Sequence, residues 1–192
     1  MRVVYSAFLA LVGGLPLTAA AAELRAEYFS LGPDLVEQFE GTGEFKELRL
    51  EFVRSDSGDY DIASSGDQSP SHARLVVGDG YITWVLGSSG ETWLKFKRNL
   101  RSGDTWHNHL RGWNQTYRVA AKNLTLSVPA GTFRHCVKID VTWVAHEHDL
   151  EGPQRISLYL APQLAVIKRQ VYSSGVEEHE EVLRSFTRPP RQ

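Results

Sequence analysis

The sequence has 192 residues, of which 42% are hydrophobic and 23% charged, and its formal net charge is −2 at pH 7. A chain of this length and composition can bury a hydrophobic core as one globular domain. Its slightly acidic balance argues against nucleic acid as a partner, because phosphate binding requires a net basic surface or a clustered basic stripe.

Residues 1–22 have the three parts of a secretory signal peptide. Arg2 supplies the positive charge, residues 3–15 form a short apolar core, and the segment ends in an A-x-A sequence of small residues. A retained membrane anchor is the alternative, but the apolar core is short for a bilayer and Pro16 would interrupt a helix there. We therefore expect cleavage before Glu23, a periplasmic or secreted location, and no stable membrane insertion after cleavage.

From residue 23 to 186 the dominant hydrophobic period is two. Apolar and polar side chains alternate in residues 48–54 and 137–143, and Ile82, Trp84 and Leu86 continue the pattern. Successive side chains of a strand point to opposite faces, so this alternation indicates a sheet with one buried and one solvated face. Turn sequences divide the region into roughly nine to eleven expected strands, which is typical of an up-and-down antiparallel meander.

Four connecting or terminal segments are expected from local composition. Asp79 and Gly80 lie between two strand-like runs and predict a tight hairpin with positive φ at both residues. Residues 64–71 are expected to form a flexible loop and residues 187–192 a disordered tail. Residues 176–186 contain good helix formers but lack a helical period, so we predict a final strand there.

Cys136 is the one cysteine of the chain. A single cysteine cannot form an intramolecular disulfide, so the core must stabilise the domain without one. Because Cys136 lies in an apolar run, we expect a buried, unreactive thiol.

Four short motifs occur in order along the chain: G-D-T-W at residues 103–106, V-P-A-G-T-F at 128–133, C-V-K at 136–138, and A-P followed by V-I-K-R within 161–169. Together they resemble a family of exported bacterial proteins of unknown function, sometimes labelled TapB-like, near a broader domain-of-unknown-function group. Members have glycines where this chain has Gln163 and Ala165, so different backbone angles are expected in that turn.

The resemblance implies a strongly curved antiparallel sheet in the cell envelope, often lipid-anchored, and it implies no known activity. Combined with the period-two pattern, it predicts an all-β fold of one curved sheet, shaped as a half-barrel or an open barrel. In the V-P-A-G-T-F motif, Pro129 presets φ and Gly131 supplies positive φ, so this turn is expected to set the register of the next strand.

Tryptophans are the leading candidates for ligand binding. If they line the concave side of the curved sheet, they could hold an acyl chain, a peptide or a sugar. The alternative is that they simply fill the hydrophobic core. The candidate residues are Trp84, Trp106, Trp113 and Trp143.

Two H-x-H pairs are candidates for a metal site: His107 with His109, and His146 with His148. Residues i and i+2 of a strand share a face, so two such strands side by side could offer four imidazoles to zinc or copper. The alternative is that both pairs lie at polar strand ends on the solvated face, and we favour this alternative.

The sequence contains no H-E-x-x-H, phosphate-binding glycine loop, C-x-x-C pair or G-x-S-x-G in a strand-to-helix context. We therefore expect no enzyme and no cofactor. The leading interpretation is a non-enzymatic protein that binds a small hydrophobic ligand or an envelope partner in the concavity of the sheet. The alternatives are a metal-dependent protein and a structural accessory of an envelope complex, which would expose an apolar patch on its outer face.

Overall fold

The computed structural model describes residues 28–29, 31–32, 34–42, 46–66, 71–87, 89–110, 112–145, 154–173 and 175–188. The expected signal peptide and its cleavage site lie outside these residues. The described part of the chain contains no helix, and therefore none long and apolar enough to cross a membrane.

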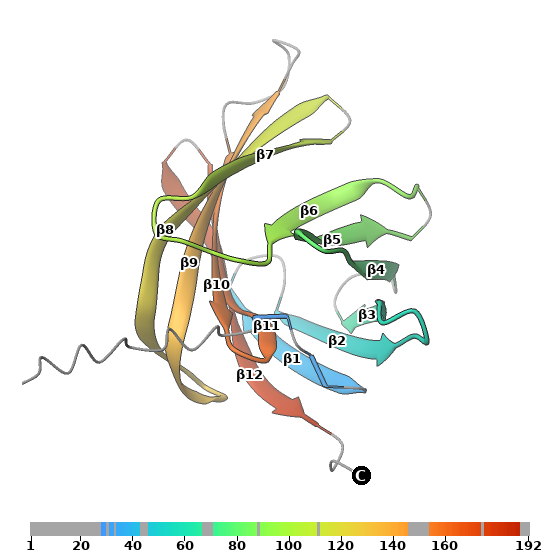
Figure 1. The fold of residues 1–192 in the computed structure, drawn as a ribbon. Coiled ribbons are helices and arrows are strands. Elements are labelled where there is room, and N and C mark those ends of the chain that lie inside the picture. Colours follow the sequence, from blue (N-terminus) through green and yellow to red (C-terminus); the bar gives the residue numbers. More distant parts are fainter. Residues whose placement is uncertain are drawn as a thin grey trace, which may run out of the picture.

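Twelve antiparallel strands form one sheet that curls into a barrel shape (Figure 1). The predicted fold class is confirmed, with one strand more than the upper end of the expected range. The strands are β1 (Leu35–Gly41), β2 (Glu47–Arg54), β3 (Tyr60–Gly66), β4 (Ser71–Val77), β5 (Tyr81–Leu86), β6 (Thr92–Lys97), β7 (Thr105–Leu110), β8 (Trp113–Val128), β9 (Gly131–Ala145), β10 (Gln154–Ala161), β11 (Leu164–Ser173) and β12 (Val176–Thr187).

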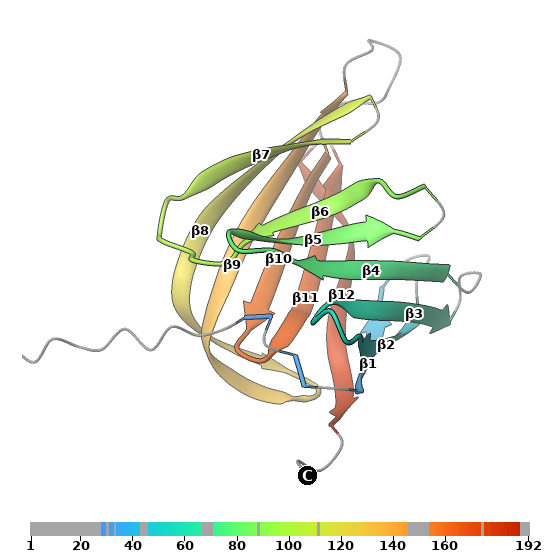
Figure 2. The same cartoon turned by 45° about the vertical axis from the view of Figure 1, so that its right-hand side comes forward.

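The strand order departs from a simple meander at one place. Every strand is paired with its sequence neighbours except β6 and β7, which are the two edges of the sheet, and β1 is paired with β12. The first and last strands therefore join the two halves, and the edges β6 and β7 face each other on the opposite side. Figure 2 shows β3 to β6 crossing the steeper strands β8 to β11.

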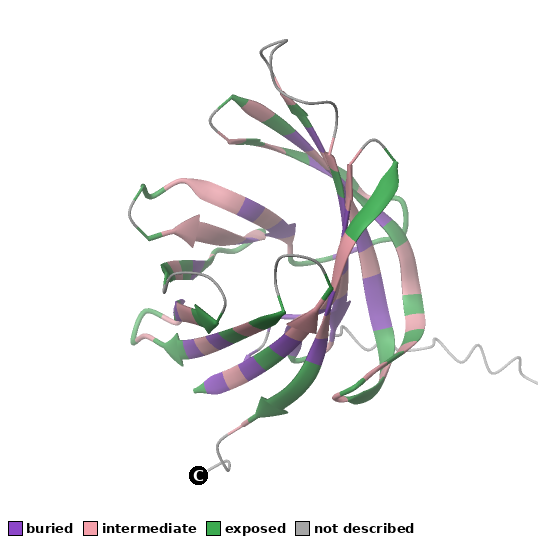
Figure 3. Cartoon of the chain, turned by 180° about the vertical axis from the view of Figure 1, so that it is seen from behind, coloured by how far each residue is buried: buried purple, intermediate pink, exposed green. Residues whose placement is uncertain are grey.

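Burial follows the predicted period of two. In β9 the side chains of Val137, Ile139 and Val141 are buried, whereas those of Lys138 and Asp140 are only partly buried on the other face. The same alternation of buried and more exposed positions recurs along the other strands (Figure 3). The core therefore lies on the concave side of the sheet, as expected for a sheet with one solvated face.

The last strand confirms the choice of strand over helix at residues 176–186. β12 ends at Thr187, one residue beyond the expected boundary, because it is paired with both β1 and β11. Arg188 follows, and its guanidinium donates to the carbonyl of Gln163 at 2.7 Å. Gln163 has φ +63°, so it adopts the left-handed conformation that glycine favours.

An N-terminal segment closes one end of the barrel shape. Tyr28, Phe29 and Leu31 are buried there, and the ring of Phe29 lies 4.7 Å from that of Phe96. The hydroxyl of Tyr60 donates to the carbonyl of Leu31 at 2.5 Å. The segment is therefore packed into the core immediately before β1 begins.

The long β8–β9 hairpin reaches the same end of the molecule. Its turn has Gly131 at φ +138°, which confirms the predicted positive φ, and the amide of Ala130 donates to the carbonyl of Leu183 in β12 at 3.1 Å.

Cys136 in this hairpin is fully buried, and burial raises the pKa of its thiol to about 11. The thiolate is therefore scarce at neutral pH, in line with the predicted unreactive cysteine.

The β4–β5 hairpin is present, but the prediction about its turn is wrong. Neither Asp79 nor Gly80 has positive φ, so the turn is not of the mirror-image type expected from that dipeptide. Instead, the backbone amide of Arg98 donates to the carbonyl of Gly80 at 3.1 Å. The turn therefore has a different conformation from the predicted one, and its Gly80 carbonyl is hydrogen-bonded to Arg98, the residue that follows β6.

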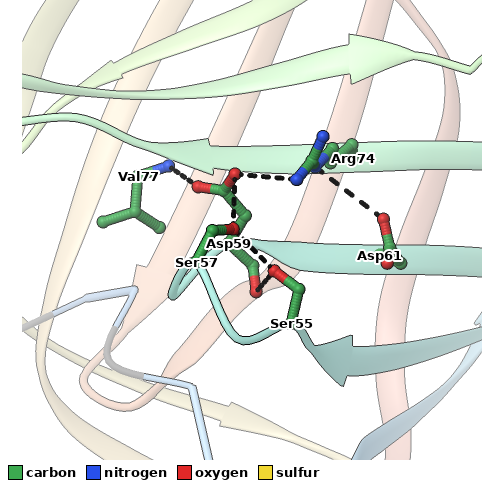
Figure 4. A network of polar contacts seen from close by, with 6 residues as sticks. All are labelled: Ser55, Ser57, Asp59, Asp61, Arg74 and Val77. Carbon is green, nitrogen blue, oxygen red and sulfur yellow. Dashed lines mark hydrogen bonds and ion pairs between the residues drawn. The ribbon is translucent and has the colours of Figure 1, made fainter.

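Polar contacts hold the β2–β3 turn against the end of β4 (Figure 4). The carboxylate of Asp59 accepts from the amide of Val77 at 2.9 Å and pairs with Arg74 at 3.1 Å. The hydroxyl of Ser57 donates to the same carboxylate at 3.1 Å. One side chain therefore joins the β2–β3 turn to β4.

The expected flexible loop at residues 64–71 is shorter than predicted. β3 continues through Gly66 and β4 begins at Ser71, because Ser64 is paired with Ser71 across the two strands. The intervening residues 67–70 lie outside the described part of the chain.

Candidate functional site

The concave side of the sheet contains a cavity of about 270 Å³. Its walls come from both halves of the sheet, β1 to β6 on one side and β10 to β12 on the other. The described lining residues are Glu37, Phe39, Glu47, Leu48, Leu50, Phe52, Ile62, Ser64, Ser71, Ala73, Trp84, Leu86, Trp93, Leu94, Leu158, Ala165, Val166, Arg169 and Glu181.

Aromatic side chains form one wall of the cavity. The indole of Trp84 packs edge-on against Phe52 at 6.5 Å and against Trp93 at 5.7 Å between ring centroids. Trp93 reaches this face because the β5–β6 register shifts at Trp84, which leaves Trp93 as an extra residue opposite no partner. A β-bulge of this kind redirects a side chain, and here it adds a second indole to the wall.

An ion pair lies in the wall formed by β11 and β12. Arg169 and Glu181 are directly opposite in the ladder, and the guanidinium of Arg169 pairs with the carboxylate of Glu181. The Nε2 atom of His179 lies 4.0 Å from the same carboxylate. Arg169 and Glu181 therefore neutralise each other within the largely apolar cavity.

Glu37 in β1 is the most unusual residue of the site. Its side chain is fully buried, and neither carboxylate oxygen has a hydrogen-bond partner. Burial raises its pKa to about 8, and the backbone of Ala165 and the charge of Arg188 only partly counteract that rise. An unpaired buried charge is costly, so the ionised form of Glu37 lowers the free energy of unfolding of the protein.

The cavity reaches the surface at one end of the barrel shape. Glu47 and Ser71, which line it, are exposed and stand at the first residues of β2 and β4. The opposite end is closed by the packed N-terminal segment with Phe29 and Leu31. The cavity is therefore open to solvent at the end where β2 and β4 begin.

Of the four tryptophans predicted to bind ligand, Trp84 is in the described wall of the cavity. Trp106 lies between the sheet edges, stacked on Tyr117 at 5.1 Å, and its indole N–H donates to the carbonyl of Lys95 at 2.6 Å. Trp113 and Trp143 form an edge-on pair at 6.3 Å. Trp106, Trp113 and Trp143 therefore contact other residues of the protein. A contact between any of these three tryptophans and a ligand stays a prediction.

The side chains of β7 and β8 close the barrel shape where a backbone ladder is missing. The amide of Gln115 donates to the carbonyl of Trp93 at 2.8 Å, and that of Asn108 to the carbonyl of Thr92 at 3.1 Å. The amide of Lys95 donates to the hydroxyl of Tyr117 at 3.1 Å. We call this set of contacts the β6–β7 seam; it satisfies backbone groups of an edge strand that would otherwise be left without partners.

The described histidine pair, His107 and His109, is not part of the cavity lining. The Nδ1 atoms of His107 and His109 in β7 lie 3.2 and 3.1 Å from side-chain oxygens of β8. Strand β8 separates β7 from β9, so the strands leading to the two pairs are not neighbours. His146 and His148 lie outside the described residues, and within those residues no three His, Cys, Asp or Glu side chains are grouped to hold a metal ion.

Large apolar side chains exposed on the described surface come from four strands. They are Val53, Val76, Val144, Val176 and Phe186. The outer apolar patch expected of an envelope accessory therefore stays a prediction.

The sequence analysis did not identify the polar groups of the cavity. Leu35, Glu37 and Phe39 alternate with more exposed residues, so Glu37 occupies a buried phase of its strand. A charged residue in that phase is a recognisable signal, because buried carboxylates are rare unless paired. Arg169 and Glu181 carry the same signal in β11 and β12.

No family model and no curated protein matches this sequence. Among solved structures, the chain is similar to a protein from Bacteroides fragilis described as exported and as having a YmcC-like fold. The TM-score is 0.60 at 12% identity, covering 85% of this chain and 100% of that one. A protein from Parabacteroides distasonis described as a lipoprotein has a TM-score of 0.49 at 12% identity, covering 84% and 99%. The first similarity shows that the chain shares the fold of the Bacteroides fragilis protein.

Proposed function

We propose that this chain is an exported, non-enzymatic binding protein that holds a small, mainly apolar ligand in the interior cavity. The cavity is the observation that carries the proposal. Small-molecule sites are concave and mostly apolar, with a few placed polar groups, and this cavity combines an aromatic wall with Glu37 and an ion pair.

The polar groups of the cavity favour binding over catalysis. The hydroxyls of Ser64 and Ser71 lie 2.6 Å apart, so each has the other as its partner and not a general base. Arg169 and Glu181 are likewise paired with each other. Among the described lining residues this arrangement orients a ligand without activating a nucleophile.

Export is supported by the tripartite N-terminal sequence and by the exported description of the structurally similar Bacteroides fragilis protein. N-terminal sequencing of the protein recovered outside the cytoplasm should begin at Glu23 or within about two residues of it. A protein that retains Met1 and fractionates with the membrane would contradict export in this form.

The binding proposal is tested with N-phenyl-1-naphthylamine, an apolar fluorescent probe that is uncharged at neutral pH. Titration should show saturable binding of one probe per chain. Ala73 lines the cavity, whereas Ala63 belongs to the outward-facing set of the adjacent strand β3. Ala73→Leu should lower the probe affinity about tenfold by filling the cavity, and Ala63→Leu should leave it unchanged.

Two outcomes would contradict the binding proposal. One is a wild-type protein that does not bind the probe. The other is an equal loss of affinity in both variants, which would place the probe outside the cavity.

A further inference from the structure

Glu37 is a buried carboxylate that faces the cavity with no partner. Both oxygens lack a hydrogen bond, although the side chain is completely excluded from solvent. Arg188 is the nearby cation whose charge partly counteracts the rise in its pKa; two nitrogens of that guanidinium donate to Gln163, at 3.2 Å to the side-chain oxygen and 2.7 Å to the carbonyl, and its Nε has no hydrogen-bond partner. The fold therefore keeps a buried carboxylate whose oxygens have no hydrogen-bond partner, and the Ala165 backbone and the Arg188 charge only partly offset its burial.

The charges of the described lining residues do not balance. Glu37, Glu47, Arg169 and Glu181 are the ionisable lining residues, and Arg169 is paired with Glu181. Glu47 stands at the mouth with an exposed side chain and lies 3.6 Å from Arg184. Among these lining residues, Glu37 is therefore the carboxylate without an ion-pair partner.

Burying an unpaired carboxylate costs more stability than burying a neutral glutamine or an apolar leucine at the same position would. A ligand that places a positive charge against the carboxylate would offset this cost, because ionic hydrogen bonds are stronger in a water-excluded site. The aromatic wall formed by Phe52, Trp84 and Trp93 would contact the apolar part of the same ligand.

We propose that the cavity selects an amine with a single positive charge and an apolar body, and that the Glu37 carboxylate binds its ammonium group. This inference rests on the proposed binding function and specifies its ligand class. In the complex the ammonium donates to the carboxylate oxygens that lack partners in the free protein, while the apolar body occupies the space between the indoles and the aliphatic walls.

The test compares three probes of equal chain length: n-octylamine, 1-octanol and octanoate. Isothermal titration of the wild-type protein at pH 8 should rank octylamine above octanol and octanol above octanoate. Glu37→Gln keeps the shape of the side chain and removes its charge, so it should weaken octylamine about 10- to 100-fold and leave octanol unchanged. Glu51→Gln makes the same chemical change at a residue paired with Arg49 outside the cavity, and it should alter none of the three affinities.

The pH dependence of octylamine binding gives a second readout. Glu37 must lose its proton to bind the ammonium, so octylamine affinity should rise between pH 6 and pH 8 in the wild type and stay flat in Glu37→Gln. The other titratable or charged groups around this part of the cavity are Arg169 in β11, His179 and Glu181 in β12, Arg188 after β12, and Glu47 in β2. All of these groups remain in Glu37→Gln. The pH profile of octylamine affinity in that variant therefore measures their contribution without that of Glu37.

The outcomes separate this inference from the binding function. If octanol or octanoate binds as tightly as octylamine, or if Glu37→Gln binds octylamine as well as the wild type, the ligand class is wrong while cavity binding stands. If none of the three probes nor the naphthylamine binds, both proposals are wrong. Urea melts of Glu37→Gln check its folding, and the ranking of the three probes on the wild type requires no variant.

Discussion

The carboxylate of Glu37 shows how a single residue can oppose the stability of its own fold. Folding removes it from water without a compensating partner, and burial raises its pKa from 4.5 to about 8. Between these two values the unfolded chain has lost the proton and the folded chain keeps it. Because the unfolded state then binds fewer protons, the free energy of unfolding falls as the pH rises through this window.

Replacing Glu37 by Gln should therefore stabilise the protein in a pH-dependent way. Near pH 4.5 and below, the free energies of unfolding of variant and wild type should be similar, and by pH 8 the variant should be more stable by about 2–5 kcal/mol. Urea melts at pH 4.5 and pH 8 measure the difference. Glu51→Gln, which removes an exposed ion pair, should change stability by less than about 1 kcal/mol at either pH. An equal gap between Glu37→Gln and wild type at both pH values would contradict the raised pKa.

The backbone of Gly131 gives a second prediction at this scale. At φ +138° a β-branched residue is strained, although the space around the missing side chain is open. Gly131→Val should therefore lower the free energy of unfolding by about 1–3 kcal/mol. Gly80 also has open space but lacks positive φ, so Gly80→Val should cost less than about 1 kcal/mol. Equal costs in urea melts would show that backbone strain at Gly131 is not responsible.

Among the elements, the strands themselves were predictable because their alternating pattern is local. Residues 48–54 and 137–143 contain enough apolar positions to specify β2 and the core half of β9. The pairing of β1 with β12 was not predictable, since it joins segments almost a whole chain apart and each pattern fits many partners. The mirror-image turn expected at Asp79 and Gly80 failed because local turn preference gave way to tertiary contacts.

The cavity was predictable only in part, because its walls depend on how distant strands are arranged in the sheet. Curvature and an aromatic concave wall were expected, and Trp84 lies in that wall. Trp93 enters it through a register shift, and Trp106 is used by the β6–β7 seam, which exists only because two edges meet. Such roles depend on which strands face each other, and a single sequence does not contain that information.

Gln115 connects β8 to β6 and β7 in the seam, so its replacement should weaken the contacts of all three strands there. Its amide donates to Trp93, and its oxygen accepts from Asn108 and Tyr117, each at 2.7 Å. Gln115→Leu leaves these buried groups unsatisfied and should lower the free energy of unfolding by about 2–4 kcal/mol. Hydrogen exchange should also accelerate at the amide of Lys95, which donates across the seam.

Gln38→Leu is the matched control for the seam. Gln38 is exposed on β1 and accepts from the hydroxyl of Ser185 at 2.9 Å, so its loss should cost less than about 1 kcal/mol. If Lys95 exchanges at the same rate in Gln115→Leu as in the wild type, the seam is not held by the glutamine.

At the scale of the whole molecule, the fold is shared with an exported-type protein at only 12% identity. The sheet can therefore be specified by the alternation of apolar and polar residues rather than by particular side chains. The interior of this chain contains a cavity of about 270 Å³ with two indoles and a buried carboxylate whose oxygens have no hydrogen-bond partner. The central claim of our account is that this interior is a ligand site and not merely imperfect packing.

Native mass spectrometry of the protein, purified without denaturation from the compartment to which its own cells export it, tests this claim most directly. The account predicts a mass increment corresponding to one small molecule per wild-type chain. The increment should persist in Ala63→Leu and be much less populated in Ala73→Leu, whose added atoms take up part of the cavity. A wild-type chain at its bare mass, or an increment that is undiminished in Ala73→Leu, would contradict it.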